Sequence, residues 1–131
     1  MERTIVNPWQ WSIPMGFNQG EVVTGQTRTL FLAGQASVDG EGTVQHPGDM
    51  AGQITQVVDN IEAVLREAGM SLANLVRLTI FTTDVDLCFQ HYGLLASRTA
   101  AAGVAPPGTL VGVARLAYPE LMVEIEATAV A

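Results

Sequence analysis

The sequence has one cysteine, few charged residues and no long apolar run, and each shortage excludes a class of protein. Cys88 has no second cysteine to pair with, so an internal disulfide is impossible. No apolar stretch approaches the ~20 residues that span a bilayer. The first residues lack the basic and apolar regions of a signal peptide. We therefore expect a cytoplasmic protein with no membrane partner.

Positive charge is equally scarce. Six Lys+Arg against thirteen Asp+Glu give a net charge of −7. Binding to nucleic acid draws on clustered positive charge that displaces counterions, and no basic cluster is visible, so no nucleic-acid partner is expected. Hydrophobic residues make up 48% and charged residues only 15%. Because soluble monomers rarely expose large apolar patches, part of the surface is expected to be covered by another subunit.

The length fits one domain over residues 1–131. Apolar periodicity predicts the order β-β-(β)-α-β-α-β-β. Two strands are expected on either side of residues 24–28, followed by a short one around residues 43–45. The remaining predicted segments are helices at 48–71 and 84–103 and strands at 72–85, 109–116 and 121–131. One sheet with two helices packed on a single face, an α+β two-layer domain, is the economical solution.

Helix boundaries have recognisable residues. Asp49 is placed to cap the first helix, and Gly69 to follow its last turn. Asp86 is expected to cap the second helix and Gly103 to end it. Gly93 lies inside the second helix and weakens the helical pattern there.

The last strand carries two carboxylates on one face. Glu124 and Glu126 are two residues apart, so their Cα atoms lie ~6.6 Å apart. A carboxylate pair in a pocket performs acid–base work if burial raises one pKa. The same spacing also suits a solvated strand face. Arg115, expected across a hairpin from them, would relieve their repulsion.

Other reactive side chains lack chemical partners. His46 and His91 have no second ligand at metal-like spacing, so no metal site is predicted. Cys88 lies on a predicted helix without a basic neighbour, which favours a buried filler over a nucleophile. Trp9 and Trp11 near the N-terminus favour sealing an edge or an interface over binding a ligand. The "AGQ" of 33–35 and the "PPGT" of 106–109 lie at strand ends, where backbone can approach a ligand closely.

Several segments together resemble the RidA family, also called YjgF or L-PSP. They cover nearly the whole chain in the family's order: "FLAGQASVD", "AGQITQVVDNIEAVLREAG", "LVRLTIFTTDVD", "PPGTLVGVARL" and "VEIEATAV". The resemblance implies a chorismate-mutase-like α+β domain with a mixed sheet. It also implies a homotrimer with a central β-barrel and three clefts between subunits that hold a small molecule. The family's best-known activity hydrolyses reactive enamines and imines and needs no cofactor.

The resemblance assigns site residues position by position. In the deaminating branch an arginine after the cleft proline grips the substrate carboxylate, as arginine does well. That position here is Gly108, and Arg115 matches a separate family arginine. Thr109 is the nearest remaining polar side chain at this ligand-binding lip.

Four further positions belong to the same cleft. The family's cleft tyrosine aligns with Phe17, and a hydroxyl residue before the family's "GQ" aligns with Ala33. Gly34 is kept, as is the glutamate thought to position the attacking water, Glu124. The ligand-binding pocket is therefore expected to be more apolar than the family archetype, with Glu124 as its catalytic residue.

Two functions stay open at this point. One is an enzyme that hydrolyses or tautomerises an imine or enamine lacking the usual carboxylate, with Glu124 orienting water. The other is a trimer that binds a small, mostly apolar metabolite, or regulates, without chemistry. A ribonuclease is disfavoured because the net charge of −7 repels RNA. The substrate or ligand itself cannot be deduced from the sequence.

Overall fold

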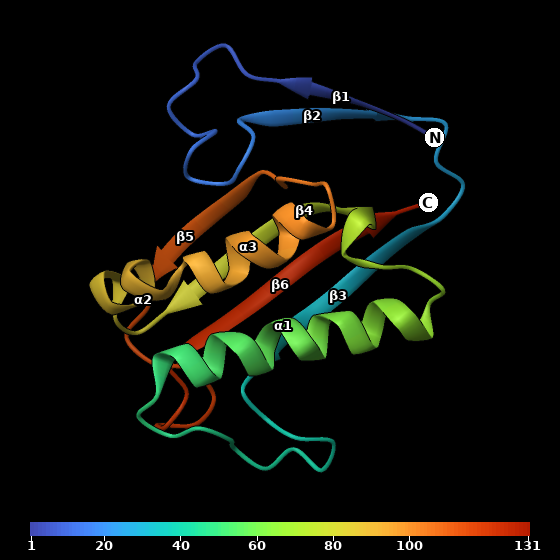
Figure 1. Cartoon of the computed structure of the whole chain (residues 1–131). Helices are drawn as coiled ribbons and strands as arrows, with labels where there is room; N and C mark the ends of the chain where they lie inside the picture. The colour runs from blue at the N-terminus through green and yellow to red at the C-terminus, as the bar shows by residue number, and fades with distance from the viewer.

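A four-stranded sheet with three helices on one face forms the body of the domain (Figure 1). The computed structural model describes all residues, 1–131. The strands lie in the order β3 (Thr29–Ala36), β6 (Val123–Val130), β4 (Leu75–Thr82) and β5 (Gly108–Gly112). The helices are α1 (Met50–Glu67), α2 (Val85–His91) and α3 (Gly93–Ala101), with a short 3₁₀ turn, η1 (Leu72–Asn74). The predicted α+β fold is confirmed.

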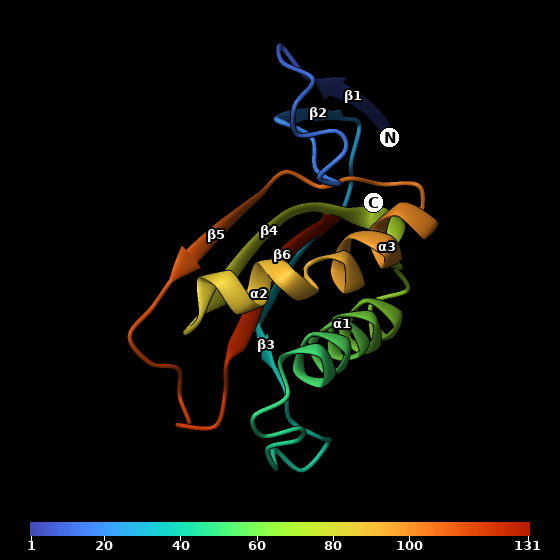
Figure 2. The same ribbon diagram turned by 60° about the vertical axis from the view of Figure 1, so that its left-hand side comes forward.

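The sheet is mixed because its edge strand β5 runs parallel to β4, whereas β6 is antiparallel to both of its neighbours. Helices α2 and α3 form the crossover between the two parallel strands. Figure 2 shows α1, α2 and α3 together on one side of the sheet. None of the helices is both long and apolar enough to cross a membrane.

The core lies between the sheet and α1. Alternate residues of β6 point into it, as predicted for the last strand, and Val123, Ile125 and Ala129 are almost fully buried. Helix α1 supplies the facing stripe at helical spacing: Met50, Ile54, Val57, Val58, Ile61 and Leu65. Asp49 caps α1 as predicted, and its side chain accepts the Gly52 N–H.

The N-terminal segment forms a ribbon that the sequence did not predict. β1 (Glu2–Val6) pairs with β2 (Gly20–Thr24) in a separate two-stranded sheet beyond one end of the main sheet (Figure 1). The two strands predicted around residues 24–28 exist but pair with different partners, β2 with β1 and β3 with β6. The segment between them carries the chain from one sheet to the other.

Three local predictions were wrong. The strand expected around residues 43–45 is only an isolated bridge between Val38 and Val44. The cap of the second helix is Asp84, not Asp86, because the Asp84 side chain accepts the Leu87 N–H. That helix also breaks in two before Gly93.

The hairpin expected between the last two strands is absent. β4 lies between β5 and β6, so Arg115 does not stand across a hairpin from Glu124 and Glu126. The long connection from Val113 to Met122 makes this arrangement possible.

Candidate functional site

Glu124 projects from the face of the sheet that carries no helix. In β6 it alternates with the buried Val123 and Ile125, and it pairs with Ala36 of β3 and Phe81 of β4. It is half-buried, whereas Glu126 on the same face is exposed. The predicted placement of both carboxylates on one face is confirmed.

A β-bulge in β3 lies beside Glu124. The register of β3 against β6 shifts between Leu32 and Gln35, so Ala33 and Gly34 have no direct partner in β6. A β-carbon added to Gly34 would stand 2.8 Å from Cδ of Glu124. The carboxylate thus lies directly against the bare backbone of Gly34. Bulges of this kind re-aim side chains and backbone groups, often next to active sites.

Both backbone polar groups of Met122, two residues before Glu124, are hydrogen-bonded to side chains. Its N–H donates to Oε1 of the fully buried Gln53 at 2.8 Å, and its carbonyl accepts the Thr82 hydroxyl at 2.8 Å. Gln53 also donates to the carbonyls of His46 and Glu120. These bonds anchor the start of β6 and thereby set where Glu124 lies.

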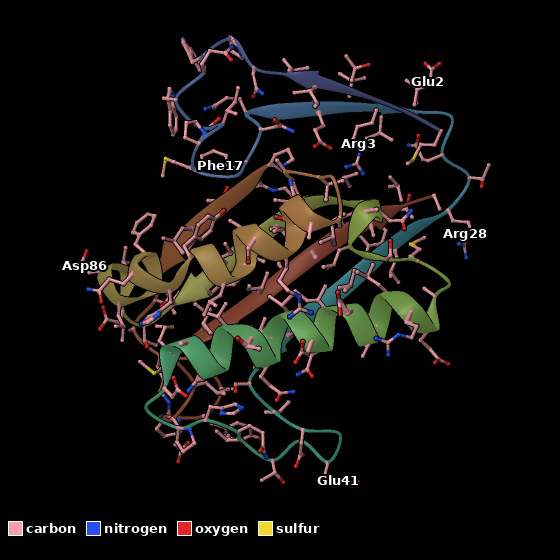
Figure 3. All side chains as sticks on the ribbon, in the orientation of Figure 1. Glu2, Arg3, Phe17, Arg28, Glu41 and Asp86 are labelled. Atoms are coloured by element: carbon pink, nitrogen blue, oxygen red, sulfur yellow. The ribbon has the colours of Figure 1, made fainter.

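Three of the other predicted residues meet at a separate hollow of about 230 Å³. Phe17, Gly108 and Thr109 all line it. Figure 3 labels Phe17 on the N-terminal segment where it faces the start of β5. The remaining lining residues are Trp11, Met15, Leu78, Ile80, Phe89, Tyr92, Pro106 and Leu110. None of the side chains that line the hollow carries a charge.

Gly108 faces the same side of the sheet as Leu78, its partner in β4. A β-carbon at residue 108 would stand 3.7 Å from Leu78 Cβ and 3.4 Å from the Leu78 carbonyl oxygen. These are ordinary contacts, and Gly108 has no positive φ. The backbone at this position would therefore accept a longer side chain.

Thr109 connects the hollow to the opposite face of the sheet. Its hydroxyl accepts a hydrogen bond from Nη2 of Arg77 at 2.6 Å. Arg77 also lines a second depression, of about 190 Å³, which includes Glu126 and the exposed Phe31. Arg77, which is bonded to Thr109, therefore lies on the helix-free face of the sheet.

One chain does not bring the two groups of predicted residues together. Glu124 is level with Phe81, which pairs with Val111, three residues beyond Gly108. The Cα atoms of Glu124 and Gly108 are therefore separated by two strand spacings across the sheet and three residues along a strand, which amounts to ~14 Å. Their side-chain positions also lie on opposite faces of the sheet. Ala33, Gly34 and Glu124 thus form one half of the candidate site, and Phe17, Gly108 and Thr109 form the other.

The aromatic wall of the hollow was not predicted. Trp11, for which sealing an edge or an interface was favoured over ligand binding, lines the hollow and meets Phe17 edge-on at 5.7 Å between ring centroids. Phe89 and Tyr92 come from α2 and its end, three residues apart, a spacing that puts both on one helical face. That spacing was the available signal for this wall.

Cys88 and Tyr92 are the two groups whose pKa is clearly displaced. Burial raises the pKa of the Cys88 thiol, and a hydrogen bond with Thr82 opposes this in part. Cys88 is 2% exposed, as expected of a buried filler. Burial also raises the pKa of the Tyr92 phenol. No three His, Cys, Asp or Glu side chains gather at one place in the chain.

Comparison with known proteins finds relatives that match most of the chain. Residues 14–131 match the family described as Endoribonuclease L-PSP. A RutC family protein of Synechocystis is 33% identical over 132 residues, 99% of this chain and 98% of the relative. The 2-iminobutanoate/2-iminopropanoate deaminase of Escherichia coli is 32% identical over 102 residues, 77% and 78% of the two chains.

A solved structure agrees with the fold over its full length. YyfB of Yersinia pestis, described as a protein of unknown function of the conserved Rid protein family, superposes with a TM-score of 0.88. It is 32% identical and covers 100% of both chains. The sequence match and this superposition extend across the same domain, and the chain therefore belongs to the L-PSP family, known also as RidA or YjgF.

Proposed function

We propose that this protein hydrolyses or tautomerises reactive imines or enamines that lack the carboxylate used by the deaminase archetype. The observation that carries the proposal is the Glu124 carboxylate, held against the bare backbone of Gly34 at a β-bulge. A half-buried carboxylate beside exposed backbone is suited to orient a water molecule and move a proton. The 2-iminobutanoate/2-iminopropanoate deaminase among the relatives is named for imine substrates, and those imines carry a carboxylate.

The reaction is a balanced hydrolysis of a carbon–nitrogen double bond. Glu124 accepts a proton from water as the water oxygen bonds to the imine carbon, and the C=N π pair moves to nitrogen. That proton then passes to nitrogen, which gives a carbinolamine. The hydroxyl proton next moves to nitrogen through the Glu124 carboxylate as the C–N bond breaks and the C=O bond forms, so a carbonyl compound and ammonia leave. Such imines already hydrolyse readily, so one positioned carboxylate is sufficient machinery.

The composition restricts the alternatives for this chemistry. The sequence contains no lysine, so no side-chain amine is present to form a Schiff base with a carbonyl substrate. Direct attack by water therefore fits the residues that are present. No cofactor enters this mechanism.

The proposal includes a homotrimer whose clefts lie between subunits, acting in the cytoplasm. Glu124 and Gly108 lie on opposite faces of one chain's sheet, so a second copy has to bring the other half of each site. The helix-free face supports this assembly, because Phe31 there is 78% exposed. An apolar ring left in water is costly and favours a covered face.

An imine-hydrolysis assay tests the proposed reaction. An amino-acid oxidase generates a panel of imines, and their breakdown is followed with the wild type, Glu124→Gln and the matched control Glu126→Gln. We expect the wild type and Glu126→Gln to accelerate breakdown and Glu124→Gln to lose at least about 100-fold, within the range for a general base. Unchanged turnover in Glu124→Gln would contradict the mechanism.

A non-catalytic binding or regulatory trimer is the second candidate function. The uncharged, aromatic lining of the hollow favours it, because such a site holds an apolar metabolite without any catalytic group. Mass spectrometry of the purified protein, coupled to the same imine panel, separates the two functions. A ligand that co-purifies intact, with no imine turned over, would establish binding without chemistry.

A further inference from the structure

The hollow beside Gly108 is built by three segments distant in sequence. The N-terminal segment between β1 and β2 supplies Trp11, Met15 and Phe17, and the region of α2 supplies Phe89 and Tyr92. Its floor is the end of the sheet at Leu78, Ile80 and Leu110. Large apolar side chains from separate segments thus converge on one space.

Three of these side chains are exposed to solvent in the single chain. Trp11 is 59% exposed, Phe89 51% and Met15 43%. Covering an exposed aromatic side chain with a flat apolar group is favourable, because apolar surface is removed from water. The edge-on contact of Trp11 with Phe17, at an interplanar angle of 80°, sets the two rings nearly at right angles. Such a corner is suited to hold the face and the edge of a third ring.

The size of the hollow suits a single ring with a short substituent. Its volume is about 230 Å³. An apolar protein cavity of ~150 Å³ is known to take up benzene. The space beyond one ring therefore admits a few more heavy atoms.

The polar groups near the hollow are neutral. Burial raises the pKa of the Tyr92 phenol, which therefore keeps its proton at neutral pH. Thr109 also lines the hollow, but its hydroxyl points to the opposite face of the sheet, where it accepts a hydrogen bond from Arg77. No charged side chain lines the hollow. An anionic ligand would thus enter an uncharged, apolar space and lose hydration without a partner.

We propose that this hollow is an aryl subsite, and that the substrate is an uncharged imine attached to a planar aromatic ring. The ring lies against Trp11, Phe17 and Phe89, and the Tyr92 hydroxyl bonds the polar end. This inference rests on the proposed function for the reaction and names the substrate class. Hydrolysis then converts an aryl imine and water into an aryl aldehyde or ketone and ammonia.

Tryptophan fluorescence provides a direct binding test with benzamide as the probe. Benzamide is an uncharged, planar analogue of an aryl imine, benzoate is its anionic counterpart, and cyclohexanecarboxamide replaces the ring by a non-planar one. The chain has two tryptophans, so Trp9→Phe leaves Trp11 as the only reporter and Trp11→Phe leaves Trp9. Trp9 does not line the hollow, which makes it the matched control.

We expect benzamide to change the emission of Trp9→Phe saturably and to leave that of Trp11→Phe nearly unchanged. Benzoate and cyclohexanecarboxamide should each bind at least about tenfold more weakly. Trp11 and Phe89 are both exposed, so their replacement by alanine is compatible with folding. Trp11→Ala and Phe89→Ala should each weaken benzamide binding by about tenfold, as measured by calorimetry. No binding of benzamide, or equal binding of benzoate, would overturn the aryl subsite, including the case in which another subunit fills the hollow.

Turnover separates this inference from the proposed function. If aryl imines are hydrolysed faster than aliphatic ones of equal size and Glu124→Gln abolishes the difference, both stand. If only aliphatic imines are hydrolysed in a Glu124-dependent way, the proposed function survives and the aryl subsite fails. If benzamide binds at Trp11 but Glu124→Gln changes no turnover, the subsite survives and the proposed hydrolysis fails.

Discussion

The carboxylate of Glu124 occupies the space that a side chain on Gly34 would enter. A β-carbon at residue 34 would stand 2.8 Å from Glu124 Cδ and 2.9 Å from Oε2, both closer than real contacts allow. The two residues lie on neighbouring strands, where the bulge in β3 removes their regular register. The absence of a side chain at residue 34 therefore leaves room for the Glu124 carboxylate.

Gly34→Ala should displace the Glu124 carboxylate without unfolding the domain. Residue 34 has no positive φ, so alanine fits the backbone, and the clash falls on the flexible end of a side chain. We expect imine turnover to fall about 10- to 100-fold, a typical loss for a misplaced acid–base group. Thermal melting should change little. Full activity in a folded Gly34→Ala protein would show that the position of Glu124 does not matter.

Gln53→Leu should destabilise the protein strongly, although leucine has a similar volume. The amide is fully buried and bonds the backbone of His46, Glu120 and Met122. Its removal leaves these backbone groups unsatisfied, and we expect a loss of about 2–4 kcal/mol in urea unfolding. Thr55→Ala on the exposed side of α1 is the control and should stay within ~0.5 kcal/mol. Equal stability of both variants would contradict this role of Gln53.

The sequence was sufficient to predict the helix stripe and the last strand, because each follows a local rule. The residues that alternate along β6 do so because one face is buried against α1. β1 was missed because four of its five residues are exposed, which leaves no apolar alternation to detect. The position of β5 was missed because pairing with β4, rather than with the next strand along the chain, is a property of the whole sheet.

The candidate site shows the same division. The resemblance identified Phe17, Gly108 and Thr109, and the fold brings them to one hollow. Their separation from Glu124 was not predictable, since it depends on which face of the sheet each strand presents. Phe89 and Tyr92 were missed because two aromatic residues on a short helix read equally well as core.

Two glycines that meet no neighbouring atoms should respond to alanine in opposite ways. Gly93 opens α3 with an ordinary φ, so Gly93→Ala should add about 0.5–1 kcal/mol by reducing the freedom of the unfolded chain. Gly69 follows α1 with φ +71°, where a β-carbon is strained, so Gly69→Ala should cost about 1 kcal/mol. Urea unfolding of the two variants measures both changes in the free energy of unfolding. A change of the same sign in the two variants would contradict these roles of the two glycines.

Stability should fall at alkaline pH because of Cys88. Burial raises the pKa of its thiol in the folded state above the unfolded value of about 8.5. Below that pH the Cys88 thiol is protonated in both the folded and the unfolded state, so it does not change the free energy of unfolding. Above it the unfolded chain releases its proton first, so the free energy of unfolding declines until the folded pKa is passed.

Urea unfolding at pH 7.5 and 9.5 should show this decline in the wild type, and Cys88→Ala should make it smaller. Tyr92, whose pKa is raised in the same direction, acts only at higher pH because its ordinary value is about 10. The comparison uses the change between the two pH values, since Cys88→Ala also removes packed volume at both. An equal decline in the two proteins would assign the alkaline sensitivity to groups other than the buried thiol.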